Sequence, residues 1–188
     1  MKTFVFYLVL LCSVLPAAHA RDFDPEKFIA DGAVLLFATG CVKYYSDPEQ
    51  FSAWIEKNTF DPIPAKHISG LIKEAGGKAW SVNNNGVRYV LAAEAGNLCT
   101  VFVKEVNLGK ARASFTEMRK GLAVPGVDER VQRDEQELDL GTVTTTQYTY
   151  SSQGKSVLRL VITESNSEKG FFQLAMSASS GKRQAGLK

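Results

Sequence analysis

The chain has 188 residues, and its 22 Lys and Arg against 20 Asp and Glu give a formal charge of +2. A hydrophobic share of 45% is typical of a folded globular protein and argues against a disordered one. Because the charge is nearly balanced, no strong field steers nucleic acid or an anionic membrane to the surface, and we expect neither as a partner.

The first residues, MKTFVFYLVLLCSVLPAAHA, have the pattern of a secretory signal peptide. Lys2 precedes an uncharged apolar run that ends at Leu15, and Ala18-His19-Ala20 is a small-residue cleavage site. The run is shorter than the roughly 20 residues that a membrane-spanning helix needs. Cys12 follows leucines rather than the small residues of a lipid-attachment site. We therefore expect cleavage after Ala20, a periplasmic or secreted protein, and no membrane span in the mature chain.

Cleavage leaves 168 residues with 21 Lys and Arg, since Lys2 is removed, against 20 Asp and Glu. This length suits one domain and buries enough surface to form a core without many crosslinks. We expect a signal peptide over residues 1–20, a single α+β domain over 21–180 and a flexible basic tail over 181–188.

The N-terminal half of the mature chain has helical patterns. Asp24 and Pro25 begin an almost wholly apolar helix that extends to Val42. A second helix begins either with a capping box that opens at Ser46 or with Asp47 as the cap. A third is expected over residues 64–75, where the apolar residues recur with helical spacing before Gly76-Gly77; these residues are Ile68, Leu71, Ile72 and Ala75.

Period-two patterns follow. Segments 78–82, 87–93 and 98–106 are expected to form a three-strand meander, with Asn85-Gly86 as a hairpin turn. A fourth helix begins at Asn107, and one of its faces is apolar: Leu108, Ala111, Phe115, Met118 and Leu122. Four further strands are expected over 129–140, 142–151, 156–165 and 171–179.

Alternation on the last strands separates two faces of the sheet. Six apolar residues are expected to line the core: Leu158, Leu160, Ile162, Phe172, Leu174 and Met176. Five polar residues are expected on a face that meets water: Thr145, Gln147, Thr149, Arg159 and Thr163. The predicted class is α+β, with the N-terminal helices packed on one face of a mostly antiparallel sheet.

Two cysteines, Cys41 and Cys99, remain after cleavage, an even number in an exported chain. A disulfide between them is the favoured interpretation, and two free buried thiols or a catalytic cysteine are the alternatives. His67 is the only histidine of the mature chain, so a Cys/His zinc site lacks ligands and a nucleophile has one possible imidazole base.

No phosphate loop, dinucleotide fingerprint, nucleophile elbow or HExxH motif occurs. We therefore expect no catalytic, cofactor-binding or metal-binding residue. Glu94, Glu105 and Glu117 remain as carboxylates for acid–base chemistry. The aromatic residues that could form a ligand pocket are interpreted as core: Tyr44, Tyr45, Trp54, Trp80 and Tyr89. The run RVQRDEQELD, 130–139, is interpreted as an edge strand whose charges discourage aggregation or dock a partner.

Several segments resemble small exported proteins of Gram-negative bacteria that have no assigned function. The resemblance covers roughly residues 28–105, with Cys41 after an apolar helix and the motifs FSAWIEKN, GGKAWSV and GVRYVLAAEAGNLCTVFV. It implies a periplasmic address and a Cys41–Cys99 bridge, and it implies no catalytic residue.

These observations favour an exported, non-enzymatic module that binds another exported or envelope protein, as an accessory subunit or a toxin inhibitor. A carrier of a small apolar ligand is the first alternative, and a deep apolar cavity is its expected mark. A carboxylate-dependent hydrolase is the second, and two carboxylates about 5–9 Å apart in a cleft are its mark.

Overall fold

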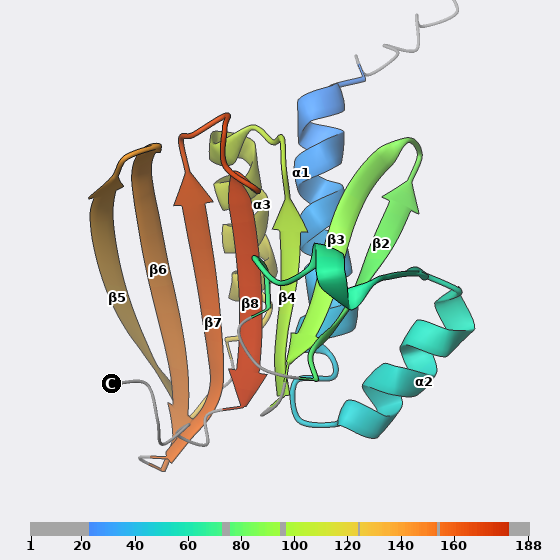
Figure 1. Cartoon of the computed structure of the whole chain (residues 1–188). Coiled ribbons are helices and arrows are strands. Elements are labelled where there is room, and N and C mark those ends of the chain that lie inside the picture. Colours follow the sequence, from blue (N-terminus) through green and yellow to red (C-terminus); the bar gives the residue numbers. More distant parts are fainter. Residues whose placement is uncertain (1–22, 73–75, 95–96, 124, 154, 181–188) are drawn as a thin grey trace, which may run out of the picture.

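The computed structural model describes residues 23–72, 76–94, 97–123, 125–153 and 155–180, and within them it shows an α+β fold with an eight-stranded antiparallel sheet and three α-helices (Figure 1). The expected signal peptide and C-terminal tail lie outside the described residues. The elements in chain order are α1 (Pro25–Leu36), the π-helix η1 (Phe37–Val42), α2 (Pro48–Asn58), β1 (Asp61–Ile63), the 3-10 helix η2 (Ala65–His67), β2 (Lys78–Asn84), β3 (Val87–Glu94), β4 (Leu98–Val103), α3 (Leu108–Lys120), β5 (Val127–Leu138), β6 (Gly141–Ser152), β7 (Lys155–Ser165) and β8 (Leu174–Ser180).

The strand order across the sheet is β1-β2-β3-β4-β8-β7-β6-β5. Two meanders, β1 to β4 and β5 to β8, therefore meet where the last strand pairs with β4. The register between those strands places Val101 opposite Met176. This non-local pairing joins the two halves into one sheet and leaves β1 and β5 as its two edges.

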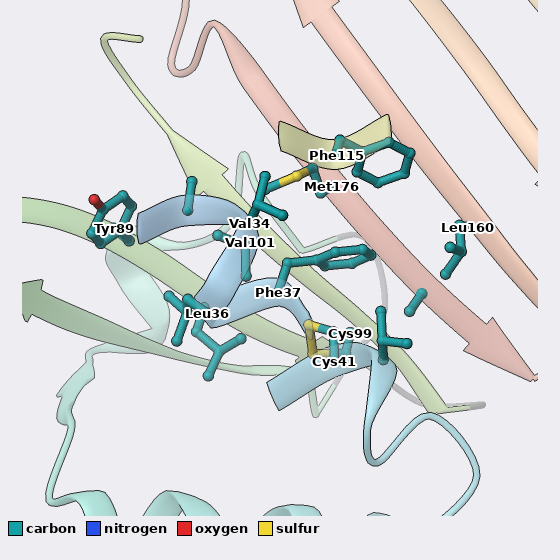
Figure 2. Packing of buried hydrophobic residues seen from close by; sticks show 14 of the residues in the cluster. Val34, Leu36, Phe37, Cys41, Tyr89, Cys99, Val101, Phe115, Leu160 and Met176 are labelled. Atoms are coloured by element: carbon teal, nitrogen blue, oxygen red, sulfur yellow. A yellow bond between two sulfur atoms is a disulfide. The ribbon is translucent and has the colours of Figure 1, made fainter. Parts of the chain in front are cut away.

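The helices pack on one face of this sheet, and the core lies between them (Figure 2). Phe37 of η1 and Phe115 of α3 are both fully buried, and their rings stack with centroids 6.0 Å apart. From the sheet, Leu91, Val101 and Leu160 complete the core. Most of the long apolar run of α1 and η1 is buried because it packs against α3 on one side and against the sheet on another.

Two glycines let the first helical segment approach its neighbours closely. A Cβ atom on Gly32 would collide with the Tyr89 hydroxyl, and one on Gly40 would collide with the Trp54 ring. Tyr89 uses that space to donate a hydrogen bond of 3.2 Å to the Ile29 carbonyl. A larger residue at Gly32 would push α1 away from β3, and one at Gly40 would push η1 away from α2.

The local signals for caps and turns are confirmed. Asp24, Asp47 and Asn107 each accept a hydrogen bond of 3.0 Å from the backbone N–H three residues ahead. Asn85 and Gly86 have φ of 50° and 84°, the left-handed pair that a tight hairpin between β2 and β3 requires.

The prediction of a helix over residues 64–75 is wrong. The described part of this segment holds only the 3-10 helix η2, followed by turns, after the short strand β1. Its apolar residues do share one side, because Ile68 and Ile72 pack with Ala79 and Ala92 in a small second cluster on the sheet face opposite the helices. Gly70 lies within this segment, and a glycine in the interior of a helix costs about 1 kcal/mol relative to alanine, which weakens the helical preference.

Five of the six expected core residues of the last strands are buried, and Phe172 is the exception. Phe172 lies before β8 begins, so the alternation of that strand does not extend to it. Its ring instead packs against Phe102, 5.1 Å away between centroids, on the face opposite the helices.

Candidate functional site

Cys41 and Cys99 form a disulfide, with their Cα atoms 5.2 Å apart. It joins the end of η1 to the start of β4, and both cysteines are buried (Figure 2). A thiolate nucleophile is therefore not available at either position. The pair acts as a structural crosslink between the helical layer and the middle of the sheet.

The other residues considered for catalysis do not come together. His67 is exposed at the end of η2. Glu94 lines a groove beside α2, whereas Glu117 lines a groove between α1 and α3. Glu105 is exposed after β4.

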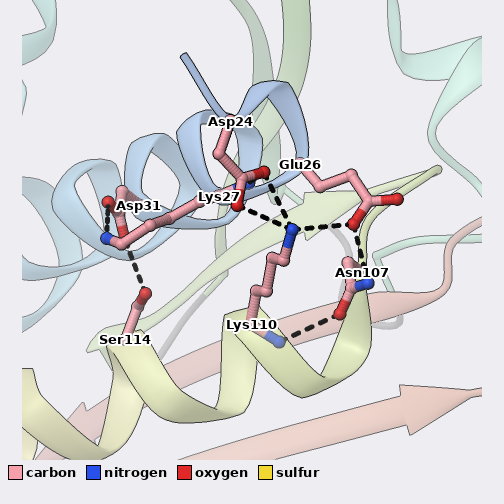
Figure 3. Close-up of polar contacts among 7 residues, drawn as sticks. All are labelled: Asp24, Glu26, Lys27, Asp31, Asn107, Lys110 and Ser114. Atoms are coloured by element: carbon pink, nitrogen blue, oxygen red, sulfur yellow. Dashed lines mark hydrogen bonds and ion pairs between the residues drawn. The ribbon is translucent and has the colours of Figure 1, made fainter. Parts of the chain in front are cut away.

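Two carboxylates do meet at the N-terminal ends of α1 and α3. The Lys110 ammonium lies 2.8 Å from the Asp24 carboxylate and 2.9 Å from the Glu26 carboxylate (Figure 3). Hydrogen bonds from Lys110 lower the pKa of both acids, and they raise the pKa of Lys110 itself. Both carboxylates are therefore held ionised, whereas a hydrolase pair needs one protonated acid. The cluster fastens two helix starts and does not have the properties of an acid–base pair.

A groove of about 490 Å³ runs beside this cluster, between α1 and α3. Val34, Leu35 and Met118 contribute apolar surface, and the Leu35 side chain is 61% exposed. At its rim, hydrogen bonds from Lys27 and Ser114 lower the pKa of Asp31. The groove opens to the exterior, since the space between helices and sheet is filled by the core.

A second cluster fastens β5 to the rest of the molecule. Arg119 of α3 pairs with Glu129 of β5, and its guanidinium lies 4.2 Å above the centroid of the Tyr148 ring. Burial, followed by the nearby Glu129 carboxylate, raises the pKa of Tyr150 to about 12. The Tyr150 hydroxyl nevertheless makes no hydrogen bond of good geometry within the described residues. Nothing in the sequence indicated this clamp, because it joins residues of different elements.

The outer edge of β5 is the most distinctive feature of the surface. All twelve residues of β5 pair with β6, and no described strand pairs with the other side. Every residue from Asp128 to Leu138 is exposed. The sequence-based interpretation of 130–139 as an edge strand is thereby confirmed. A strand of this length, without proline, presents a long row of free backbone donors and acceptors.

The sheet face opposite the helices is open over β5 to β8. Most of its residues are polar, with Val143 and Val161 among the exceptions, and they lie in rows across the strands, as Arg130, Thr149, Arg159 and Ser179 do. Hydroxyl groups bond between strands, with Thr100 and Ser177 oxygens 2.8 Å apart. The five residues that the sequence placed on this face are partly exposed there, as expected.

Within the described ranges, no group of three His, Cys, Asp or Glu side chains could hold a metal ion. None of the helices in that part of the chain combines the length and hydrophobicity needed to cross a membrane. Comparison of the chain with models of known families, with curated proteins and with solved structures gives no match.

Proposed function

We propose that this protein is a non-enzymatic module of the periplasm that binds another exported or envelope protein. It accepts an extended segment of that partner along the outer edge of β5, as an additional strand of the sheet. The expected signal peptide and the buried Cys41–Cys99 disulfide support a location in an oxidising compartment.

One observation carries the proposal: β5 is a twelve-residue strand with a free outer edge. Typical strands have about five or six residues, and exposed edges are usually kept short or interrupted by proline or a bulge. The seven charged residues of β5 discourage aggregation with identical strands, yet they leave the backbone edge accessible to a complementary segment. Backbone hydrogen bonds would supply affinity, and the side chains would supply selectivity.

The geometry gives less support to the alternatives. The helices occupy the face of the sheet where a carrier would hold its ligand, and Ala30, Ala33 and Phe37 are fully buried there. The carboxylate pair of Asp24 and Glu26 is held ionised by Lys110. A binding surface is consistent with both findings.

The test uses two proline variants at adjacent positions of β5, Gln132→Pro and Arg133→Pro. In an antiparallel edge strand, neighbouring residues direct their N–H groups alternately toward the sheet and away from it. One variant therefore breaks a bond to β6, and the other removes only an outward donor. The mature protein, carrying a tag, is used to capture partners from a periplasmic extract, and hydrogen exchange of β5 is measured in each complex.

We expect the outward-donor variant to stay folded and to lose the captured protein, and we expect β5 amides to gain protection in the wild-type complex. Capture that leaves β5 exchange unchanged, or that survives the outward proline, would contradict the proposal. A concentration-dependent dimer with protected β5 amides would assign the edge to a second copy instead.

The groove between α1 and α3 supports a second candidate, a site for a small apolar ligand, because Leu35 is exposed beside Val34 and Met118. An apolar fluorescent probe should then bind, and Leu35→Gln should weaken that binding. An equal signal from both proteins would remove this candidate.

Export is tested separately. Protein recovered from the periplasm of a host that expresses the full chain should have the intact mass of a chain that begins at Arg21. A mass that includes residues 4–15, or a lipid on Cys12, would contradict a soluble periplasmic protein.

A further inference from the structure

The side chains of β5 fall into two sets that a partner strand would meet separately. Pairing with β6 places even-numbered residues on the open face and odd-numbered residues on the helix side. A strand added to β5 would continue both sets, with one of its side chains directly beside each β5 residue. The charges of β5 can therefore be interpreted position by position.

On the open face beside the first half of β5, the cations Arg130 and Arg159 outnumber the single carboxylate of Asp128. Arg130 and Arg159 lie in one row with Thr149 between them, so their Cα atoms are about 10 Å apart, two strand spacings. Neither arginine forms an ion pair within the described residues. A carboxylate added beside Arg130 would lie within reach of an unpaired guanidinium.

The second half of β5 is acidic. Asp134 lies on the open face, and Glu135 and Glu137 lie on the helix side. The two glutamates accept hydrogen bonds from Thr144 and Thr142, which hold them along the edge. Arg133, 3.9 Å from Glu135, is the only cation among these residues, so this half attracts basic side chains.

Between the two halves, Val131 is 53% exposed on the helix side. It lies beyond the clamp that Arg119 forms with Glu129. An apolar side chain beside Val131 would bury surface that is now in contact with water.

We infer that the partner segment runs antiparallel to β5 and has its charges in a fixed order. Basic side chains lie beside Glu137, Glu135 and Asp134, an apolar side chain beside Val131, and a carboxylate beside Arg130. In chain order the segment is basic-x-basic-basic-x-x-apolar-acidic. The antiparallel direction follows from the rest of the sheet and from the better hydrogen bonds of that arrangement. This inference rests on the proposed function.

A second copy of β5 fits this surface less well. With Val131 beside its own symmetry mate, Glu129 meets Arg133, but Glu129 is already paired with Arg119. In the same register Asp128 meets Asp134, and like charges directly opposite each other are unfavourable. In this register the order of charges favours a different chain.

The test is an NMR titration of the mature, isotope-labelled protein with three synthetic peptides. The first has the inferred order, the second has the same residues in reverse order, and the third has every charge inverted. We expect the first peptide to shift β5 amide signals and to bind about tenfold more tightly than either of the others, because several cross-strand pairs change sign or position together.

Equal affinity of the three peptides, each with shifts in β5, would overturn the inferred order and leave β5 as a binding edge. If no peptide shifts β5 signals, both the order and the edge-binding function fail. Affinity of the reversed peptide above that of the first would overturn the antiparallel direction.

A charge exchange provides a second measurement. Arg130→Glu should weaken binding of the first peptide about threefold to tenfold, and a lysine at the acidic end of the peptide should restore it. Arg88→Glu makes the same change of charge on β3, far from the edge in the strand order, and should leave the affinity unchanged. Equal weakening by both variants would show an effect of net charge alone and would overturn the pairing with Arg130.

Discussion

The two edges of the sheet are constructed in different ways. β1 has three residues, includes Pro62, and covers only residues 79–81 of β2. β5 has twelve residues and no proline, and it is exposed from Asp128 to Leu138. The first edge is protected by its shortness and the second by charge alone. Charge excludes identical strands but admits complementary ones, which is why the two edges differ in what they could bind.

Loss of the disulfide is expected to have the largest effect on stability. The disulfide fastens η1 to β4, which belongs to the β1 half of the sheet. Cys41→Ala and Cys99→Ala should each lower the free energy of unfolding by about 2–5 kcal/mol. The double variant should be little less stable than either single variant, because all three remove the same disulfide bond. Chemical denaturation measures this, and additive losses would contradict it. Hydrogen exchange should rise more in β2–β4 than in β5.

Loss of the Arg119 clamp on β5 is expected to have the next largest effect on stability. Arg119→Met removes the pair with Glu129 and the contact with the Tyr148 ring, and should lower the free energy of unfolding by about 1–2 kcal/mol. Exchange at the start of β5 should increase while β1 and β2 are unaffected. Lys120→Met, a change on the same helix that affects only an exposed pair with Glu117, is the control and should have little effect.

A substitution of Pro62 tests what protects the short β1 edge from association. Pro62→Val restores a backbone donor and should change the free energy of unfolding by less than about 1 kcal/mol. Because β1 still has only three residues, the variant should remain monomeric by light scattering. Association of this variant would show that proline, rather than length, protects the β1 edge.

The smallest effect on stability is expected from the charges of β5. The triple variant Asp134→Asn, Glu135→Gln and Glu137→Gln removes three exposed negative charges and should change the free energy of unfolding by less than about 0.5 kcal/mol. Its light scattering should nevertheless increase with concentration, because the edge loses its charged protection. A variant as soluble as the wild type would indicate that these charges serve a partner only.

Sequence reasoning succeeded where the signal is local. The caps at Asp24, Asp47 and Asn107, the hairpin at Asn85-Gly86 and the alternation that buries Leu160 each depend on a few neighbouring residues. The cysteine pair was identifiable because only two cysteines remain after the expected cleavage.

Long-range arrangements could not be obtained in this way. Nothing near β8 indicates that it pairs with β4 rather than lying at an edge. The ion pair of Lys110 with Asp24 joins residues 86 positions apart, and no local pattern reports such a contact. The segment 64–75 shows the opposite error, since a helical stripe is present but its described part forms only η2 and turns, and Ile68 and Ile72 pack on the sheet without a regular helix.

The positions of the two tryptophans have a practical consequence for the study of this protein. Trp54 and Trp80 both pack against Phe51 of α2, at the β2 side of the molecule. Tyr148 and Tyr150 lie on β6, beside β5. Indole fluorescence therefore reports on one end of the sheet and tyrosine emission includes the other. Thermal unfolding followed by both tryptophan and tyrosine fluorescence would show whether the two ends of the molecule unfold together.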